Sequence, residues 1–253
     1  MRHPLHSLCP YFAMFPEDFV AKQVLAYTQR GEWVFDPFSG RGTTVFESLL
    51  NGRPAAGTDV NPVAACVAGA KANPPDLRNV LKRLDFLESE FKLGHARTDA
   101  IGLPIFFRWC FHERTLDELL FLRRELKWKT SKVDRFIAAV ALGCLHGESH
   151  KTPNCLSKWD AHRGSHRRHA RSEGGSRRRA FGVAQRRADR VSREACSQRF
   201  DDGDPEPSDQ RVPSRYFKGA VRARLCLQSD RLMICVRCRS ASSLCHRYRQ
   251  SVP

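Results

Sequence analysis

One stretch of the chain, residues 33–61, constrains the fold more than any other. It opens with an apolar run at 33–35, of the kind that forms a buried parallel strand. A glycine-containing loop follows, and from Thr43 the apolar residues take a helical spacing that stops at Asn51-Gly52. A second short strand, residues 55–58, ends in an acid. This order predicts an α/β fold with a partial doubly wound, Rossmann-like sheet.

Each part of this unit suits the binding of a nucleotide-type cofactor. Gly40 and Gly42 allow a tight turn, and they let a ligand approach the backbone without meeting a Cβ atom. The loop leads into a helix N-terminus, where free N–H groups point at the ligand. Asp59 ends the next strand, where a carboxylate can accept hydrogen bonds from both ribose hydroxyls. The alternative is a purely structural turn, but two acids and two glycines at matching places favour a cofactor site.

The loop also indicates which kind of cofactor it would take. The dinucleotide fingerprint needs a third small residue, where this chain has Val45, and a phosphate-binding loop needs a Lys after Gly42. Asp36, at the end of the first strand, would repel a pyrophosphate. It is better suited to a cofactor that carries a positive sulfonium and an α-amino group.

Residues 36–44 read Asp-Pro-Phe-Ser-Gly-Arg-Gly-Thr-Thr, and this resembles the D-P-F-x-G-x-G-T-T motif of DNA methyltransferases that modify cytosine N4 or adenine N6. Residues 11–20 resemble the helix-opening F-P-x-x-L/V segment of that family, which closes over the cofactor. The resemblance covers residues 1 to about 157 and implies S-adenosyl-L-methionine as cofactor. The cofactor-binding residues that it implies are Phe15, Asp36, Pro37, Phe38, Ser39, Gly40, Gly42, Thr43, Thr44, Asp59 and Asn61.

The family's catalytic motif, [D/N/S]-P-P-[Y/F/W], has no good match in this chain. The only Pro-Pro pair lies in Asn73-Pro74-Pro75-Asp76, whose fourth residue cannot stack on a flipped base. We interpret this tetrapeptide as a turn that ends a helix, because proline stops helices. The catalytic residues are therefore unknown. We expect the chain to be truncated or frame-shifted before its catalytic and target-recognition parts.

A helical insertion is expected within the cofactor-binding domain. Residues 76–145 contain several amphipathic helical patterns, and capping boxes predict that two of the helices begin after Thr115 and Ser131. The predicted organisation is therefore a partial methyltransferase domain over residues 1–157, with the insertion at 76–145, and a tail over 158–253.

The tail differs sharply from the rest of the chain in charge. Residues 1–150 hold 19 Lys and Arg against 17 Asp and Glu, whereas residues 151–253 hold 24 against 10. The tail is rich in Arg and Ser and shows no apolar periodicity, which predicts low order. It is either a basic arm for nucleic acid or out-of-frame translation. The abrupt change, and the lack of aromatic residues among the arginines, favour the second.

No metal site is predicted in this chain. The tail holds one C-x-x-C pair among Cys226, Cys235, Cys238, Cys245 and His246, but these spacings fit no finger that we can name. A second polar group, His146, Glu148 and His150, is interpreted as a solvated or DNA-facing loop. The ten cysteines are expected to be thiols rather than bridges.

The resemblance implies a restriction-modification type of DNA methyltransferase. Such an enzyme moves a methyl group directly to an exocyclic amino group of cytosine or adenine. We expect this chain to be an inactive fragment of one. The alternatives are an RNA guanine-N2 methyltransferase, or a nucleic-acid-binding protein without activity. We expect DNA as partner, no membrane association and a cytoplasmic location, because no signal peptide or apolar span is visible. The target base, the recognition sequence and the oligomeric state are left open.

Overall fold

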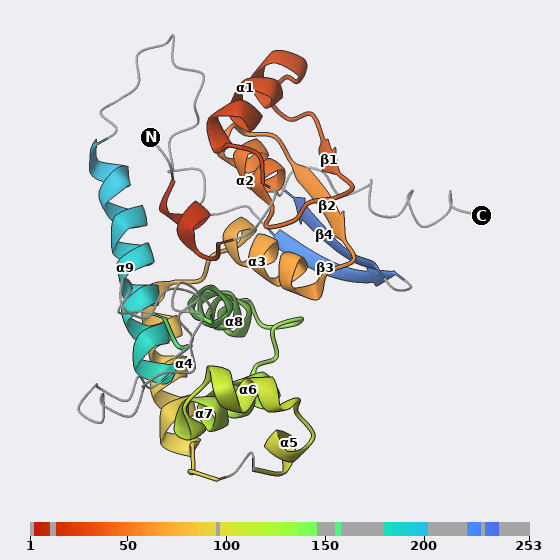
Figure 1. Ribbon diagram of the computed structural model, residues 1–253. Helices are drawn as coiled ribbons and strands as arrows, with labels where there is room; N and C mark the ends of the chain where they lie inside the picture. Colours follow the sequence, from red (N-terminus) through yellow and green to blue (C-terminus); the bar gives the residue numbers. More distant parts are fainter. Residues whose placement is uncertain are drawn as a thin grey trace, which may run out of the picture. The chain divides into compact units, whose positions relative to one another are not determined.

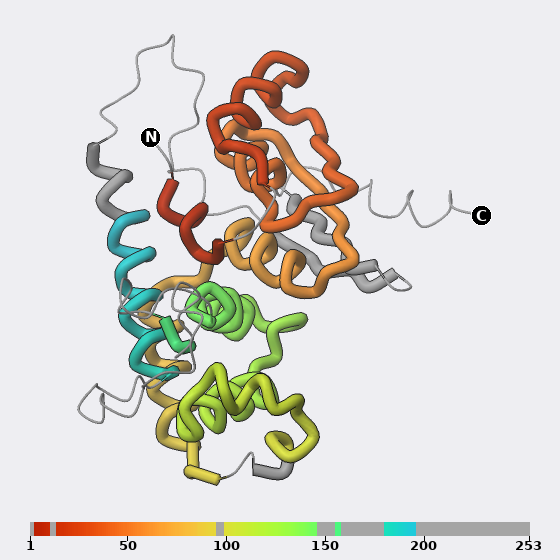
Figure 2. The backbone as a smooth tube through the Cα atoms, viewed as in Figure 1, coloured from red at the N-terminus to blue at the C-terminus, as the bar shows by residue number. Residues whose placement is uncertain are grey.

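A computed structural model describes residues 3–10, 14–94, 97–145, 155–157, 180–201, 222–228 and 231–237 (Figures 1 and 2). The chain divides into two compact units. The first unit consists of residues 1–6, 11–74 and 195–253, and the second of residues 7–10 and 75–194. The division falls at the Pro-Pro pair, one residue before the predicted start of the helical insertion. The domain boundary at 157/158 stays a prediction.

The first unit is built on the strand–helix–strand element that the sequence predicts. Strand β1 (Val34–Asp36) and strand β2 (Ala55–Asp59) pair in parallel, with Val34 opposite Ala55, and helix α2 (Thr43–Leu50) connects them. Helix α1 (Glu17–Tyr27) precedes β1 and helix α3 (Pro62–Ala72) follows β2 (Figure 1). The α/β class is therefore confirmed. The described strands contain one parallel pair, so the doubly wound arrangement stays a prediction.

Two further strands extend this sheet on the β2 side. Strand β3 (Arg222–Gln228) and strand β4 (Arg231–Arg237) form an antiparallel hairpin, and β4 pairs antiparallel with β2. The order of the strands in the sheet is β1-β2-β4-β3. The pairing joins β2 to a segment far away in the sequence, because Gly57 lies opposite Ile234.

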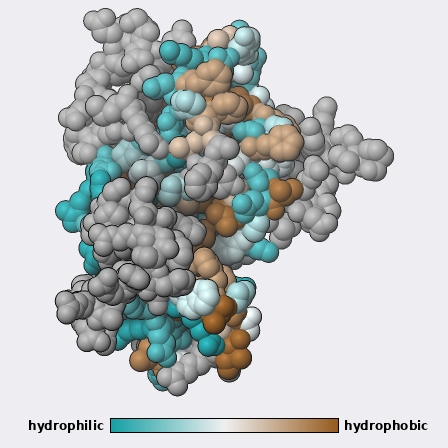
Figure 3. Space-filling model, in the orientation of Figure 1, coloured by the Kyte–Doolittle hydropathy of each residue, from teal (hydrophilic) through white to brown (hydrophobic). Residues whose placement is uncertain are grey.

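The described part of the second unit is helical. Its elements are α4 (Leu77–Glu90), α5 (Arg97–Ile101), α6 (Ile105–Cys110), α7 (Glu113–Glu125), α8 (Lys132–Cys144) and most of α9 (Ala180–Asp201). The predicted cap of α8 is confirmed, because Ser131 Oγ accepts a hydrogen bond from the Asp134 amide at 3.1 Å. The predicted cap at Thr115 is wrong. Helix α7 begins earlier, at Glu113, and Thr115 is buried in its first turn. Figure 3 shows apolar surface in the region of α5 and α6. The side chains of Ile105, Phe106 and Trp109, which all belong to α6, are exposed.

The low-order tail over residues 158–253 stays a prediction as a domain, but the structure describes regular elements within this range. In α9 the residues Phe181, Ala184, Ala188 and Val191 recur at helical spacing, and all four are buried. Single apolar residues scattered among arginines therefore form one face of a helix. In β4, the β-branched residues of the stretch 231–237 suit a strand.

None of the helices that the structure describes is both long and apolar enough to cross a bilayer. Five cysteines lie in the described residues with side chains that can be assessed, and all five are free thiols, as expected: Cys9, Cys66, Cys110, Cys144 and Cys155.

Burial makes Cys144 unreactive in the folded protein. Removal from water raises the pKa of this thiol to about 11, and the nearby Arg187 guanidinium opposes the shift only in part. Since the thiolate is the nucleophile, we expect iodoacetamide to label Cys144 far more slowly in the native than in the denatured protein. Peptide mapping by mass spectrometry measures both rates. Equal rates would show that this part of α8 is open to solvent.

Candidate cofactor site

The two predicted acids lie at one edge of the sheet. Asp36 ends β1 and Asp59 ends β2, and these strands run in parallel with Asp36 opposite Gly57. The carboxyl ends of neighbouring parallel strands meet at the same edge, which is where ligands bind in open α/β sheets. Both carboxylates therefore face the region of the loop between β1 and α2.

Hydrogen bonds hold this loop against β2. The Phe38 amide donates to Asp36 Oδ1 at 3.0 Å, so Asp36 shapes the turn that follows its own strand. Thr58 Oγ1 donates to the Pro37 carbonyl at 2.8 Å, and the Ser39 amide donates to the Thr58 carbonyl at 2.9 Å. The loop is thus a fixed extension of the sheet edge, suited to a ligand that needs a preorganised cradle.

Asp59 joins the loop to the start of α3. Its Oδ2 accepts a hydrogen bond from the Gly40 amide at 2.8 Å, and its Oδ1 accepts one from the Asn61 amide at 2.8 Å. Asn61 in turn caps α3, because its Oδ1 accepts from the Val63 amide at 2.9 Å. Each carboxylate oxygen has a second lone pair, so Asp59 keeps acceptor capacity for ribose hydroxyls while it holds the loop. The loop-holding role was not predicted from the sequence.

Gly42 is required by packing as well as by its backbone conformation. It has a φ of +75°, and a Cβ atom built there would lie 2.4 Å from Ala68 Cβ and 2.9 Å from Ala68 Cα on α3. The sequence predicted that this glycine gives room to a cofactor. The structure adds that it lets α2 and α3 approach closely, and Gly40 also has a positive φ, of +49°.

The aromatic residues predicted for the site are open to solvent. Phe38 is 88% exposed and Phe15 is 62% exposed, and the Phe15 ring lies 5.6 Å from the Phe19 ring, centroid to centroid. Exposed rings of this size are available to stack on a purine. The two threonines serve α2: Thr43 is buried in its first turn, and the Thr44 carbonyl accepts a hydrogen bond from Ser48 Oγ at 2.7 Å.

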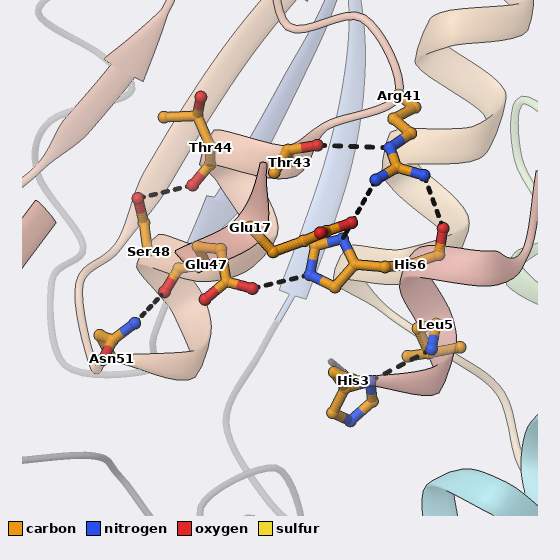
Figure 4. Close-up of polar contacts among 10 residues, drawn as sticks. All are labelled: His3, Leu5, His6, Glu17, Arg41, Thr43, Thr44, Glu47, Ser48 and Asn51. Carbon is orange, nitrogen blue, oxygen red and sulfur yellow. Dashed lines mark hydrogen bonds and ion pairs between the residues drawn. The ribbon is translucent and has the colours of Figure 1, made fainter. Parts of the chain in front are cut away.

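A charged cluster behind the loop, buried except for the half-buried Glu17, was not predicted (Figure 4). His6 Nε2 lies 2.7 Å from Glu47 Oε1, and His6 Nδ1 lies 3.6 Å from Glu17 Oε1. Arg41 pairs with Glu17 through Nη2, and its Nη1 donates to the His6 carbonyl at 2.8 Å. The members come from three separate stretches of sequence. The sequence feature that could have indicated the cluster is the charged residue between the two loop glycines.

No metal site was predicted, and no group of three or more potential ligands has a metal-binding arrangement among the residues described. Cys226 and Cys235 lie in β3 and β4. The other members of the two polar groups considered in the sequence lie outside the described residues: His146, Glu148, His150, Cys238, Cys245 and His246.

Comparison with known proteins finds DNA methylases that are similar to the part of the chain that carries this loop. Residues 3–68 match the N6/N4 family described as DNA methylase. An orphan methyltransferase, M.BamHII of Bacillus amyloliquefaciens, is 41% identical over 49 residues, which are 19% of this chain and 18% of that protein. The type II methyltransferase M.MvaI of Kocuria varians is 32% identical over 79 residues, which are 30% of this chain and 17% of that protein. No solved structure matches the chain.

These matches confirm the family resemblance over the part of the chain that carries the loop. The similarity to the N6/N4 DNA methylase family covers residues 3–68. The matched part of the chain spans less than a fifth of the length of either curated relative.

Proposed function

We propose that the unit over residues 33–61 binds S-adenosyl-L-methionine, and that it is the cofactor-binding part of a DNA methyltransferase of the kind that modifies an exocyclic amino group of cytosine or adenine. The observation that carries the proposal is the pair of carboxylates, Asp36 and Asp59, on one sheet edge beside a loop with two positive-φ glycines. When bound, the cofactor supplies an electrophilic methyl group. The family match supports DNA as the substrate.

In this proposal, different residues of the site contact different parts of the cofactor. Asp59 accepts hydrogen bonds from the ribose, and Asp36 lies where a positive amino or sulfonium group is favoured. The first turn of α2, which begins at Thr43, offers backbone N–H groups. Phe15 and Phe38 provide exposed rings for the adenine.

The Pro-Pro tetrapeptide takes no catalytic part in this proposal. Asn73 ends α3 as its C-cap, and Asp76 precedes α4 as its N-cap. Both positions fit the turn that the sequence predicted, and neither supplies an aromatic platform for a flipped base. The groups that would hold the target amino group must therefore come from elsewhere than residues 73–76.

Binding of S-adenosylhomocysteine, the stable demethylated product, tests the proposal. We expect the wild-type chain to bind it, and Asp59→Ala to lose about 1.5–3 kcal/mol of binding free energy, the scale of hydrogen bonds to a charged group. This corresponds to roughly a 10- to 150-fold weaker Kd. Isothermal titration calorimetry measures both proteins.

A matched control separates the ribose contact from general loosening of the loop. Thr58→Val removes the 2.8 Å hydrogen bond to the Pro37 carbonyl without touching a carboxylate. We expect a much smaller loss of affinity than for Asp59→Ala. Equal losses of affinity in the two variants would contradict the ribose-binding role of Asp59. A folded wild type that does not bind S-adenosylhomocysteine would refute the proposed function.

A further inference from the structure

We infer that Arg41 is a positioning residue for the cofactor loop, held from behind by a charged cluster. The cluster consists of His6, Arg41 and Glu47, which are buried, and Glu17, which is half-buried. The inference rests on the proposed function, since it deepens the account of the same site. Figure 4 shows the four side chains converging between helix α2, helix α1 and the short 3-10 helix at Pro4–Ser7.

Arg41 sits between Gly40 and Gly42, yet its side chain is 2% exposed, so it is buried in the protein rather than open to a ligand. All three parts of its guanidinium have partners. Nη1 donates to the His6 carbonyl at 2.8 Å, Nη2 pairs with Glu17, and Nε lies 3.4 Å from Thr43 Oγ1. A planar guanidinium held at three points fixes the backbone that carries it far more than a lysine ammonium does.

The partners of Arg41 are themselves fixed. Glu17 also lies 3.6 Å from His6 Nδ1, and the other ring nitrogen of His6 lies 2.7 Å from Glu47 Oε1 on α2. The His6 ring is fully buried and packs edge-on against Phe46, with ring centroids 5.0 Å apart. A buried charged cluster contributes little net stability, because desolvation offsets the attraction of its charges. Its clear effect is geometric: it sets where the loop and α1 lie.

The loop is therefore held from two sides. On the cofactor side, the Gly40 amide donates to Asp59, and on the opposite side, one residue later, Arg41 enters the cluster. Glu17 is the first residue of α1, directly after the segment that carries Phe15. Loss of the cluster should leave the loop and this segment less ordered, and the cofactor would then have to order them on binding.

Arg41→Lys tests this role, with Arg53→Lys as the matched control. Arg53 is also a buried arginine of the first unit, and it donates to the Asn51 and Thr28 carbonyls, both at 2.6 Å. We expect Arg41→Lys to weaken the Kd for S-adenosylhomocysteine about tenfold or more, which is the effect of a small misplacement in a binding site. Arg53→Lys should lower Tm while it leaves the Kd of the folded protein within about twofold.

A second variant and a second readout keep the test decisive. Glu17→Gln keeps the size of the side chain and should weaken binding in the same direction, and the double variant should lose little more than Arg41→Lys alone, because both act through one contact. Amide hydrogen exchange reports on the loop without any cofactor: exchange at residues 40–44 should become faster in Arg41→Lys and not in Arg53→Lys.

The outcomes separate this inference from the proposed function. Equal affinity losses in the two lysine variants, or unchanged loop exchange in Arg41→Lys, overturn the positioning role. A wild type that binds no S-adenosylhomocysteine overturns the proposed function instead, and the exchange experiment still decides whether the cluster orders the loop.

Discussion

Gly42→Ala should strongly destabilise the first unit. The new Cβ would lie 2.4 Å from Ala68 Cβ and 2.9 Å from Ala68 Cα, distances that real Cβ contacts essentially never show. Relief requires α2 and α3 to move apart, since the obstructing atoms belong to the backbone and to its first side-chain atom. Overpacking costs about 1–3 kcal/mol, and a positive φ in a non-glycine residue adds about 1–2 kcal/mol.

Gly31→Ala is the matched control for this experiment. Gly31 belongs to the same unit and has a φ of +89°, but a Cβ atom there meets nothing within 4 Å. Gly31→Ala should therefore lower the free energy of unfolding only by the cost of a positive φ in a non-glycine residue, about 1–2 kcal/mol. Urea denaturation of both variants gives the difference, which isolates the contact between α2 and α3. Equal losses would mean that α3 does not lie against the loop as described.

The local parts of the fold follow from short-range patterns in the sequence. The helix from Thr43, its stop at Asn51-Gly52 and the strand that ends in Asp59 are all found where apolar spacing and turn residues placed them. These features depend on neighbours within a few residues, which a single sequence displays. The two carboxylates could likewise be placed on one edge, because parallel strands joined by a helix bring their carboxyl ends together.

The parts that could not be predicted depend on residues far apart in the chain. His6, Glu17 and Arg41 carry no joint pattern, and only the fold brings them within hydrogen-bond distance. Pairing of β2 with β4 joins positions such as Gly57 and Ile234, for which no local signal exists. The close packing of Gly42 on Ala68 also could not be predicted. The sequence does not show whether a loop glycine gives room to a ligand or to a neighbouring helix.

Helix α9 was missed in the sequence for a different reason. Its apolar residues do recur at helical spacing, but the many polar residues around them hide this pattern. Its buried residues are mostly small, and arginines stand among them from Arg186 onward. Mean composition over the segment therefore indicates a chain too polar to fold. The helix is stable because other residues of the second unit provide apolar contacts and a hydrogen-bond acceptor for it. Phe181 meets Phe91 and Phe121, and the buried Glu118 carboxylate accepts a hydrogen bond from the Ala180 amide at the start of the helix.

Phe181→Ala should accordingly destabilise the second unit by about 3–5 kcal/mol, the usual cost of removing a buried phenylalanine side chain. The ring is 1% exposed, and its centroid lies 5.7 Å from that of Phe91 and 6.2 Å from that of Phe121. Arg193→Ala on the same helix is the control, since this side chain is 77% exposed and forms a surface ion pair with Asp189, so stability should barely change. Chemical denaturation of both variants compares them. If Phe181→Ala lowers the free energy of unfolding no more than Arg193→Ala does, α9 does not pack on the aromatic residues of the second unit. That result would favour the interpretation of residues 158–253 as a low-order tail.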